Sequence, residues 1–192
     1  MEIAVFAYGS LVSRPSAELT LGRAVPVQAP AALRGYGRGF TLIRDNRRCE
    51  KTFARRDDGW VPDHVLALNL DPGVPEQEVN GALIDVSVEE LADLDRRELR
   101  YRRIDVTERI GDAAAAFGRV YTYVARGEHH APVPPVSAVV LSSYERTVEE
   151  AFAGLGAGEL GRYRETTDRG EAERIDAYLL TGEIPARNPR AW

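Results

Sequence analysis

The chain has 192 residues, of which 44% are hydrophobic and 29% are charged, and its formal net charge is −5. This length predicts a single domain, residues 1–192, with a substantial core. No apolar run approaches the roughly 20 residues of a membrane-spanning helix, and the negative charge argues against general nucleic-acid binding. Since the N-terminal residues lack the features of a secretory signal and Cys49 is the only cysteine, we expect a soluble, cytoplasmic protein.

The first predicted element is a buried strand from Glu2 to Ala7 that ends in a Tyr-Gly-Ser turn. Later strands are expected where apolar residues alternate or form short runs bounded by Gly, Pro or Asn. These later strands lie within residues 25–43, where bulges or bends are expected, and within 64–70, 82–86, 103–110 and 118–125.

Three helices are predicted. The first follows Ser87, which forms a capping-box pattern with Glu90. The second spans about Val136 to Ala153, the third lies near Glu171 to Leu180, and residues 186–192 are expected to be a C-terminal tail. Because most strands precede most helices, the sequence favours an α+β fold over a doubly wound one.

A glutamate occupies an apolar position of the first predicted helix. Leu91, Leu94 and Glu98 follow i, i+3, i+7 spacing, so Glu98 is expected to point with the leucines, whereas Arg97 falls elsewhere around the axis. Burying an ionised carboxylate is costly unless it is paired or hydrogen-bonded. The position therefore indicates a buried ion pair, a frayed helix end, or a cavity in which Glu98 is a general acid/base.

The Tyr8-Gly9-Ser10-Leu11 segment also has two interpretations. A strand that ends in Gly-Ser is commonly a structural turn. Alternatively, the successive N–H groups of Gly9, Ser10 and Leu11, joined by the Ser10 hydroxyl, form a nest that binds a substrate carboxylate.

Other polar residues give weaker signals. The segment Arg44 to Arg56 mixes basic and acidic residues, which predicts a solvated loop or, alternatively, a rim that attracts an anionic substrate. His64, His129 and His130 lack the spacing of a metal site, so no metal is expected. Ser10 lacks the Gly-x-Ser-x-Gly context of a hydrolase nucleophile.

The Tyr8-Gly9-Ser10-Leu11 segment and the later segment with Glu98 together resemble the γ-glutamyl cyclotransferase superfamily. That superfamily includes ChaC-like and AIG2-like proteins and γ-glutamylamine cyclotransferases. The resemblance extends to residues 33–40, 79–84 and 142–144.

The resemblance implies a small mixed β-barrel flanked by α-helices. It also implies that Tyr8-Gly9-Ser10-Leu11 binds a γ-glutamyl moiety, that Tyr144 lines the pocket and that Glu98 is the acid/base. The implied substrate is a small γ-glutamyl molecule, whose α-amine attacks its own γ-carbonyl and releases 5-oxoproline and an amine or peptide. This reaction requires no cofactor, because the substrate supplies the nucleophile.

Two other functions remain open at this point. One is a noncatalytic member of the same fold that binds a small metabolite or a protein through the same cavity. The other is a hydrolase that releases free glutamate. Glu98 favours an enzyme, because binding alone does not need a base.

Overall fold

The computed structural model describes residues 2–25 and 28–182, so the expected C-terminal tail at 186–192 lies outside the described residues. The strands are β1 (Ile3–Ala7), β2 (Ala29–Arg34), β3 (Tyr36–Asp45), β4 (Lys51–Arg55), β5 (His64–Pro72), β6 (Glu78–Val86), β7 (Tyr101–Asp105), β8 (Arg119–Ala125), β9 (Ala138–Leu141), β10 (Thr167–Asp168), β11 (Glu173–Ile175) and β12 (Ala177–Gly182). The α-helices are α1 (Arg14–Leu21), α2 (Val88–Arg97), α3 (Ser142–Leu155) and α4 (Glu159–Glu165). None of the helices in the described ranges is long and apolar enough to cross a membrane.

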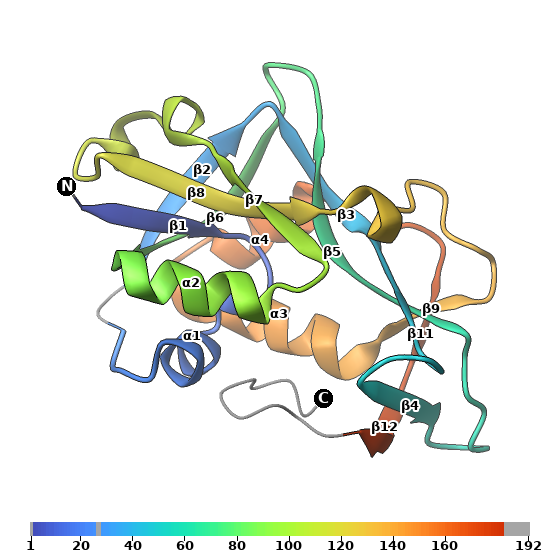
Figure 1. Cartoon of the computed structure of the whole chain (residues 1–192). Helices are drawn as coiled ribbons and strands as arrows, with labels where there is room; N and C mark the ends of the chain where they lie inside the picture. The colour runs from blue at the N-terminus through green and yellow to red at the C-terminus, as the bar shows by residue number, and fades with distance from the viewer. Residues whose placement is uncertain (1, 26–27, 183–192) are drawn as a thin grey trace.

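The strands form two five-stranded sheets and one two-stranded pair (Figure 1). The first sheet has the order β2-β6-β1-β8-β7, the second has the order β10-β3-β5-β9-β11, and β12 pairs with β4. Both larger sheets are mixed, because β1 runs parallel to β8 and antiparallel to β6, and β5 runs parallel to β9 and antiparallel to β3. The α+β class is thus confirmed, with mixed sheets and flanking helices.

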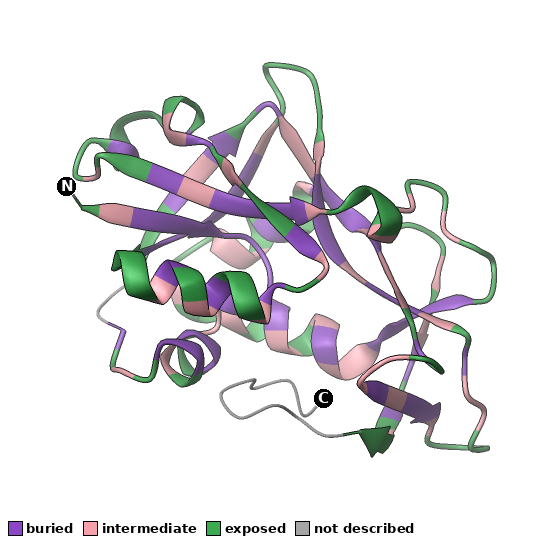
Figure 2. Ribbon diagram, in the orientation of Figure 1, coloured by how far each residue is buried: buried purple, intermediate pink, exposed green. Residues whose placement is uncertain are grey.

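Strand β1 lies at the centre of the first sheet, and the Tyr8-Gly9-Ser10-Leu11 segment follows directly after its last residue. Its residues from Ala4 to Ala7 are at most 2% exposed. Most of the strand is accordingly drawn in purple, the colour of buried residues, in Figure 2. Such a strand is apolar throughout because both of its faces are covered. Gly81 of β6 faces β1 so closely that a Cβ there would collide with the Ala7 carbonyl. The fold thus fixes the direction in which the chain leaves β1.

Side chains join the two larger sheets at two adjacent residues of β5. The Tyr101 hydroxyl of β7 donates to the Leu68 carbonyl at 2.7 Å. The side-chain oxygen of Asn69 accepts from the Ala125 N–H of β8 at 2.8 Å. These bonds hold the ends of β7 and β8 against the second sheet, beside the end of the first predicted helix.

The prediction of a helix near 171–180 is wrong, because that segment forms β11 and β12. Strand β11 pairs with β9, and β12 pairs with β4, which begins more than 120 residues earlier. Pairing with distant strands decided the conformation here, and a local pattern does not contain that information.

Two other predicted elements differ clearly in where they begin and end. The helix expected from 136 begins at Ser142, because Ala138–Leu141 forms the fully buried strand β9, and it ends at Leu155. The strand expected over 103–110 spans Tyr101–Asp105 and is followed by 3₁₀ turns. Helices α1 and α4 were not predicted. The capping box of Ser87 and Glu90 at the start of α2 is confirmed.

Candidate active site

The chain leaves β1 through Tyr8 and Gly9 and enters a short 3₁₀ turn over Ser10–Val12. The Val12 N–H donates to the Gly9 carbonyl at 2.9 Å, which closes the turn. Within the described part of the chain, the backbone N–H groups of Gly9, Ser10 and Leu11 donate to no protein acceptor. Three successive donors are therefore available to an anion, which is the geometry that the nest hypothesis requires.

Buried Arg38 of β3 holds the backbone before this turn. It is 1% exposed, and its six hydrogen bonds go to neutral oxygens, among them the Asn80 carbonyl at 2.7 Å and the Tyr8 carbonyl at 3.3 Å. Burial lowers the pKa of Arg38 to about 10, so the guanidinium remains charged at neutral pH. The Tyr8 carbonyl and the Gly9 N–H belong to the same trans peptide group, so they point in opposite directions. Because the carbonyl accepts from Arg38, the Gly9 N–H points away from Arg38.

Glu98 is buried as the spacing predicts, with 5% exposure, but it is not within the helix. It is the C-cap of α2, with φ −89° and ψ 48°, and its N–H donates to the Leu94 carbonyl at 2.8 Å. Its own carbonyl accepts from the Tyr101 N–H at 2.8 Å, which starts the turn into β7. The carboxylate is therefore held by a helix end and a tight turn.

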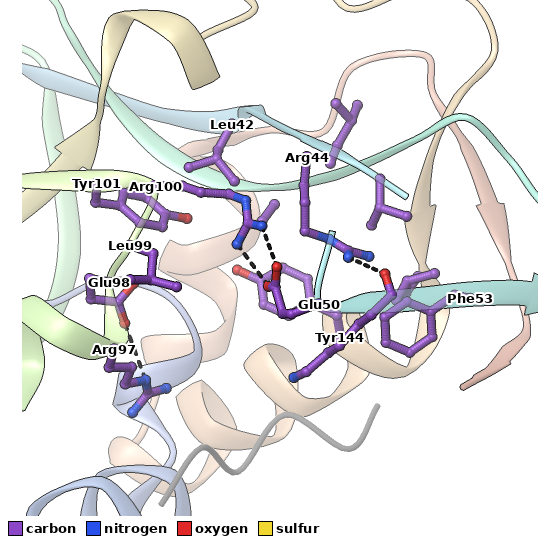
Figure 3. A pocket seen from close by; sticks show the side chains of 15 residues that line it. Leu42, Arg44, Glu50, Phe53, Arg97, Glu98, Leu99, Arg100, Tyr101 and Tyr144 are labelled. Atoms are coloured by element: carbon purple, nitrogen blue, oxygen red, sulfur yellow. Dashed lines mark hydrogen bonds and ion pairs between the residues drawn. The ribbon is translucent and has the colours of Figure 1, made fainter. Parts of the chain in front are cut away.

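Arg97 was expected elsewhere around the helix axis, yet its side chain is 3% exposed and belongs to the site. Its Nε lies 3.2 Å from Glu98 Oε1. The dashed line between Arg97 and Glu98 in Figure 3 marks this ion pair. Its Nη1 donates to the Ser16 carbonyl at 3.3 Å and to the Thr20 hydroxyl, both in α1. Spacing could have revealed this residue, because Arg97 follows Leu94 by three positions and so shares its helix face.

Three tyrosines surround the same region. The Tyr8 hydroxyl donates to the Tyr123 carbonyl at 2.7 Å, and burial raises the pKa of Tyr8 well above its usual value. The Tyr101 hydroxyl donates to the Leu68 carbonyl, while the Tyr144 hydroxyl accepts from the Leu68 N–H at 3.3 Å. Tyr144 also lies 3.4 Å from the position that a Cβ on Gly9 would take. The predicted Tyr144 thus lies beside the β1 turn.

Two pockets meet at Glu98. The first, which we call the Tyr8 pocket, is lined by the Tyr8-Gly9-Ser10-Leu11 segment, Leu68 and Tyr123. The second, the Arg44 pocket, contains Arg44, Glu50, Lys51, Arg97 and Arg100. Both pockets are also lined by Ala67, Glu98, Tyr101 and Tyr144. The structure therefore brings all the predicted site residues together, with the carboxylate where the two pockets join.

The Arg44 pocket includes part of the segment that could have been a solvated loop or a rim. Arg100 donates to both Glu50 oxygens, at 2.9 and 2.7 Å (Figure 3). Burial raises the pKa of Glu50, but the hydrogen bonds and charge of Arg100 lower it more strongly, to about 2. The segment thus contributes to the wall of the pocket, which agrees with the interpretation as a rim.

This α+β fold of two mixed sheets places a buried carboxylate where two pockets join, as in a small enzyme with a single acid/base. A family model described as "Gamma-glutamyl cyclotransferase, AIG2-like" matches residues 5–142. The chain belongs to this family, so the resemblance noted in the sequence is confirmed.

Solved structures share the fold of this chain. One named "Gamma-glutamyl cyclotransferase" has a TM-score of 0.58 and 14% identity, over 89% of this chain and 90% of the other. An uncharacterized protein from Homo sapiens has a TM-score of 0.57 and 15% identity, over 88% and 90% of the two chains. YkqA from Bacillus subtilis has a TM-score of 0.50 and 19% identity, over 88% of this chain and 56% of its own. No curated protein matches the sequence.

Proposed function

We propose that this chain is a γ-glutamyl cyclotransferase, which cleaves a γ-glutamyl amide or peptide and releases 5-oxoproline and an amine or peptide. The observation that carries the proposal is the position of Glu98, a buried carboxylate shared by the Tyr8 pocket and the Arg44 pocket. In the proposed complex the γ-glutamyl group lies in the first pocket and the leaving group in the second. The scissile amide then lies beside Glu98.

The Tyr8 pocket binds the γ-glutamyl group in this proposal. The N–H groups of Gly9, Ser10 and Leu11 receive its α-carboxylate, since oriented backbone donors form anion sites. Arg38 positions this segment through the Tyr8 carbonyl. Holding the γ-glutamyl chain in a folded conformation brings its α-nitrogen toward the γ-carbonyl, and such positioning supplies a large part of the acceleration.

Glu98 moves the protons. It accepts a proton from the α-ammonium, and the freed nitrogen lone pair attacks the γ-carbonyl carbon to form the five-membered ring. When the tetrahedral intermediate collapses, the bond from that carbon to the leaving nitrogen breaks, and Glu98 returns the proton to this nitrogen. The carboxylate then accepts the second proton of the ring nitrogen and passes it to the released amine, which leaves neutral 5-oxoproline. Arg97 holds the carboxylate in place through its 3.2 Å contact. Neither a cofactor nor an activated protein nucleophile takes part.

The test uses the purified protein with a panel of γ-glutamyl peptides and amines, and 5-oxoproline is measured by mass spectrometry. The Glu98→Gln variant should lose about 100-fold or more in kcat, because general acid–base catalysis contributes at least that much. The matched control is Glu150→Gln, which changes an exposed glutamate of α3 and should retain full activity.

Three outcomes of this experiment separate the candidate functions. Formation of 5-oxoproline that is lost with Glu98→Gln supports the cyclotransferase. Free glutamate as the product would identify a hydrolase instead. Binding of γ-glutamyl compounds without either product would favour a noncatalytic member of the fold.

A further inference from the structure

Two buried hydroxyl groups lie on α1, a helix that takes no part in the proposed reaction steps. Ser16 and Thr20 are each 3% exposed, and they share the buried face of the helix with Ala17 and Leu21. Their four-residue spacing places them one above the other on that face. A buried hydroxyl costs free energy unless it is hydrogen-bonded, so these two residues need partners in the folded protein.

Their shared partner is the guanidinium of Arg97. The Thr20 hydroxyl donates to the Ser16 carbonyl at 2.8 Å, and its oxygen accepts from Arg97 Nη1. The Ser16 carbonyl accepts from the same Nη1 at 3.3 Å, and the Ser16 hydroxyl oxygen accepts from Nη2 at 3.4 Å. Helix α1 thus holds the outer edge of the guanidinium with neutral oxygen atoms.

The inner edge of the same guanidinium faces Glu98. A guanidinium is planar, and its N–H donors form a rigid fork. Because α1 holds Nη1 and Nη2, the direction of Nε is fixed as well, and Nε lies 3.2 Å from Glu98 Oε1. The acceptors on α1 carry no charge, so they orient Arg97 without competing with the carboxylate for its positive charge.

Helix α1 is also the continuation of the turn proposed to bind substrate. The turn spans Ser10–Val12 and α1 begins at Arg14, so one residue separates them. Arg97 Nη2 donates to the Ser10 hydroxyl at 3.5 Å, and α1 packs against α2 (Figure 1). The turn and α1 therefore both contact the residue that precedes Glu98. This linkage fixes the carboxylate relative to the segment that holds the γ-glutamyl group.

We infer that Ser16 and Thr20 are positioning residues for the reaction, which act through Arg97 and hold the Glu98 carboxylate beside the scissile amide. This inference rests on the proposed function, because it takes Glu98 as the acid/base. Proton transfer requires the carboxylate within hydrogen-bond reach of the attacking and leaving nitrogens, so a displaced Arg97 lowers kcat. Binding of the γ-glutamyl group by the β1 turn does not require the Thr20 hydroxyl.

The experiment compares Thr20→Val with Thr20→Ser, using the best substrate of the γ-glutamyl panel. Valine has nearly the shape of threonine but lacks the hydroxyl, whereas serine keeps the hydroxyl and lacks the methyl group. In Thr20→Val, kcat for 5-oxoproline formation should fall by about tenfold, because one hydrogen bond to a charged group contributes on that scale. Thr20→Ser should retain the wild-type kcat, and KM should stay within about twofold of wild type in both variants.

The matched control is Thr147→Val in α3. The Thr147 hydroxyl makes the same type of bond within its helix, to the Ser143 carbonyl at 3.0 Å, and Thr147 lines neither the Tyr8 pocket nor the Arg44 pocket. This variant should leave kcat and KM unchanged. An equal loss of kcat in both valine variants would reflect a general cost of removing a helical hydroxyl and would overturn the inference.

Nuclear magnetic resonance separates this inference from the proposed function. If the wild type forms no 5-oxoproline, the cyclotransferase is overturned, but hydrogen exchange at the Arg97 Nε–H still tests whether α1 holds Arg97 against Glu98. Thr20→Val should speed this exchange by about tenfold, and Thr20→Ser should not, because the buried pair opens more often without the hydroxyl. Unchanged exchange in Thr20→Val overturns the inference. In an active enzyme, so does an unchanged kcat in Thr20→Val, or a Thr20→Ser variant that is as slow as Thr20→Val.

Discussion

Arg97 and Glu98 are neighbours in the chain, and their side chains form a buried ion pair, with Nε 3.2 Å from Oε1. Adjacent helical residues do not face each other, so this pair forms only because α2 ends between them. The end of the helix thus determines the orientation of the carboxylate that we propose as the acid/base.

Removing the cation of this pair should destabilise the fold. Arg97→Met should lower the free energy of unfolding by about 3 kcal/mol, because it leaves a buried carboxylate without this partner. Adding Glu98→Gln should restore part of the loss. Urea denaturation of both single variants and the double variant measures the coupling as a double-mutant cycle. A coupling energy below about 0.5 kcal/mol would show that the contact contributes little.

Space at the β1 turn should control substrate binding. A methyl group in Gly9→Ala would lie 3.4 Å from the Tyr144 hydroxyl, which the fold tolerates, but it would occupy the Tyr8 pocket. We expect an unchanged melting temperature and a KM for the γ-glutamyl substrate raised by about tenfold. The control is Gly154→Ala, in α3, where nothing lies within 4 Å of the new Cβ. An unaltered KM in Gly9→Ala would contradict a role for this turn in binding.

The buried guanidinium of Arg38 should not be replaceable by an ammonium. Arg38→Lys keeps the charge but loses the planar fork that reaches Asn80, Thr166 and Thr167. We expect a loss of about 3 kcal/mol in the free energy of unfolding, since several buried acceptors lose their donors. Thermal and urea unfolding measure the loss, and Arg146→Lys is the exposed control. Wild-type stability in Arg38→Lys would mean that the acceptors find other donors.

The Glu50–Arg100 ion pair should make the free energy of unfolding depend on pH. The pKa of Glu50 in the folded state is about 2, below the value of about 4.3 in an unfolded chain. Its stabilising contribution is therefore complete above about pH 5 and is lost as the pH falls toward 2. The stability difference between wild type and Glu50→Gln should shrink between pH 6 and pH 3, as measured by urea denaturation. The difference for Glu150→Gln should stay constant, and a constant difference for Glu50→Gln would refute the pair's role.

The parts of the fold that the sequence predicts are those with local signals. The capping box of Ser87 and Glu90 marks the start of α2, and the apolar run of β1 marks a central strand. Helix α1 has comparable signals, because Pro15 is typical of a first helical turn and Gly22 of a C-cap, where it adopts a φ of 70°. Strand β12 has no such local signal. It forms by pairing with β4, which lies far away in the chain.

The site, like the fold, could be predicted only where neighbouring residues in the sequence form a recognisable pattern. The i, i+3, i+7 spacing identified Glu98 as a buried residue, although the residue lies just past the helix. Arg38 was not identified, because charged residues on strands usually face solvent, and Arg44 was named only as part of the segment Arg44 to Arg56. Their roles depend on acceptors such as Asn80 and Asn46, which only the folded chain brings within reach.

The central place of β1 has a consequence for how the protein is made. Its neighbours β6 and β8 begin at residues 78 and 119, so β1 leaves the ribosome well before the two strands that pair with its edges. During that interval an apolar strand with open edges is a template for pairing with other chains. The residues proposed to bind substrate are therefore synthesised long before the strands that enclose them, and variants that weaken the pairing of β1 should aggregate more readily during synthesis.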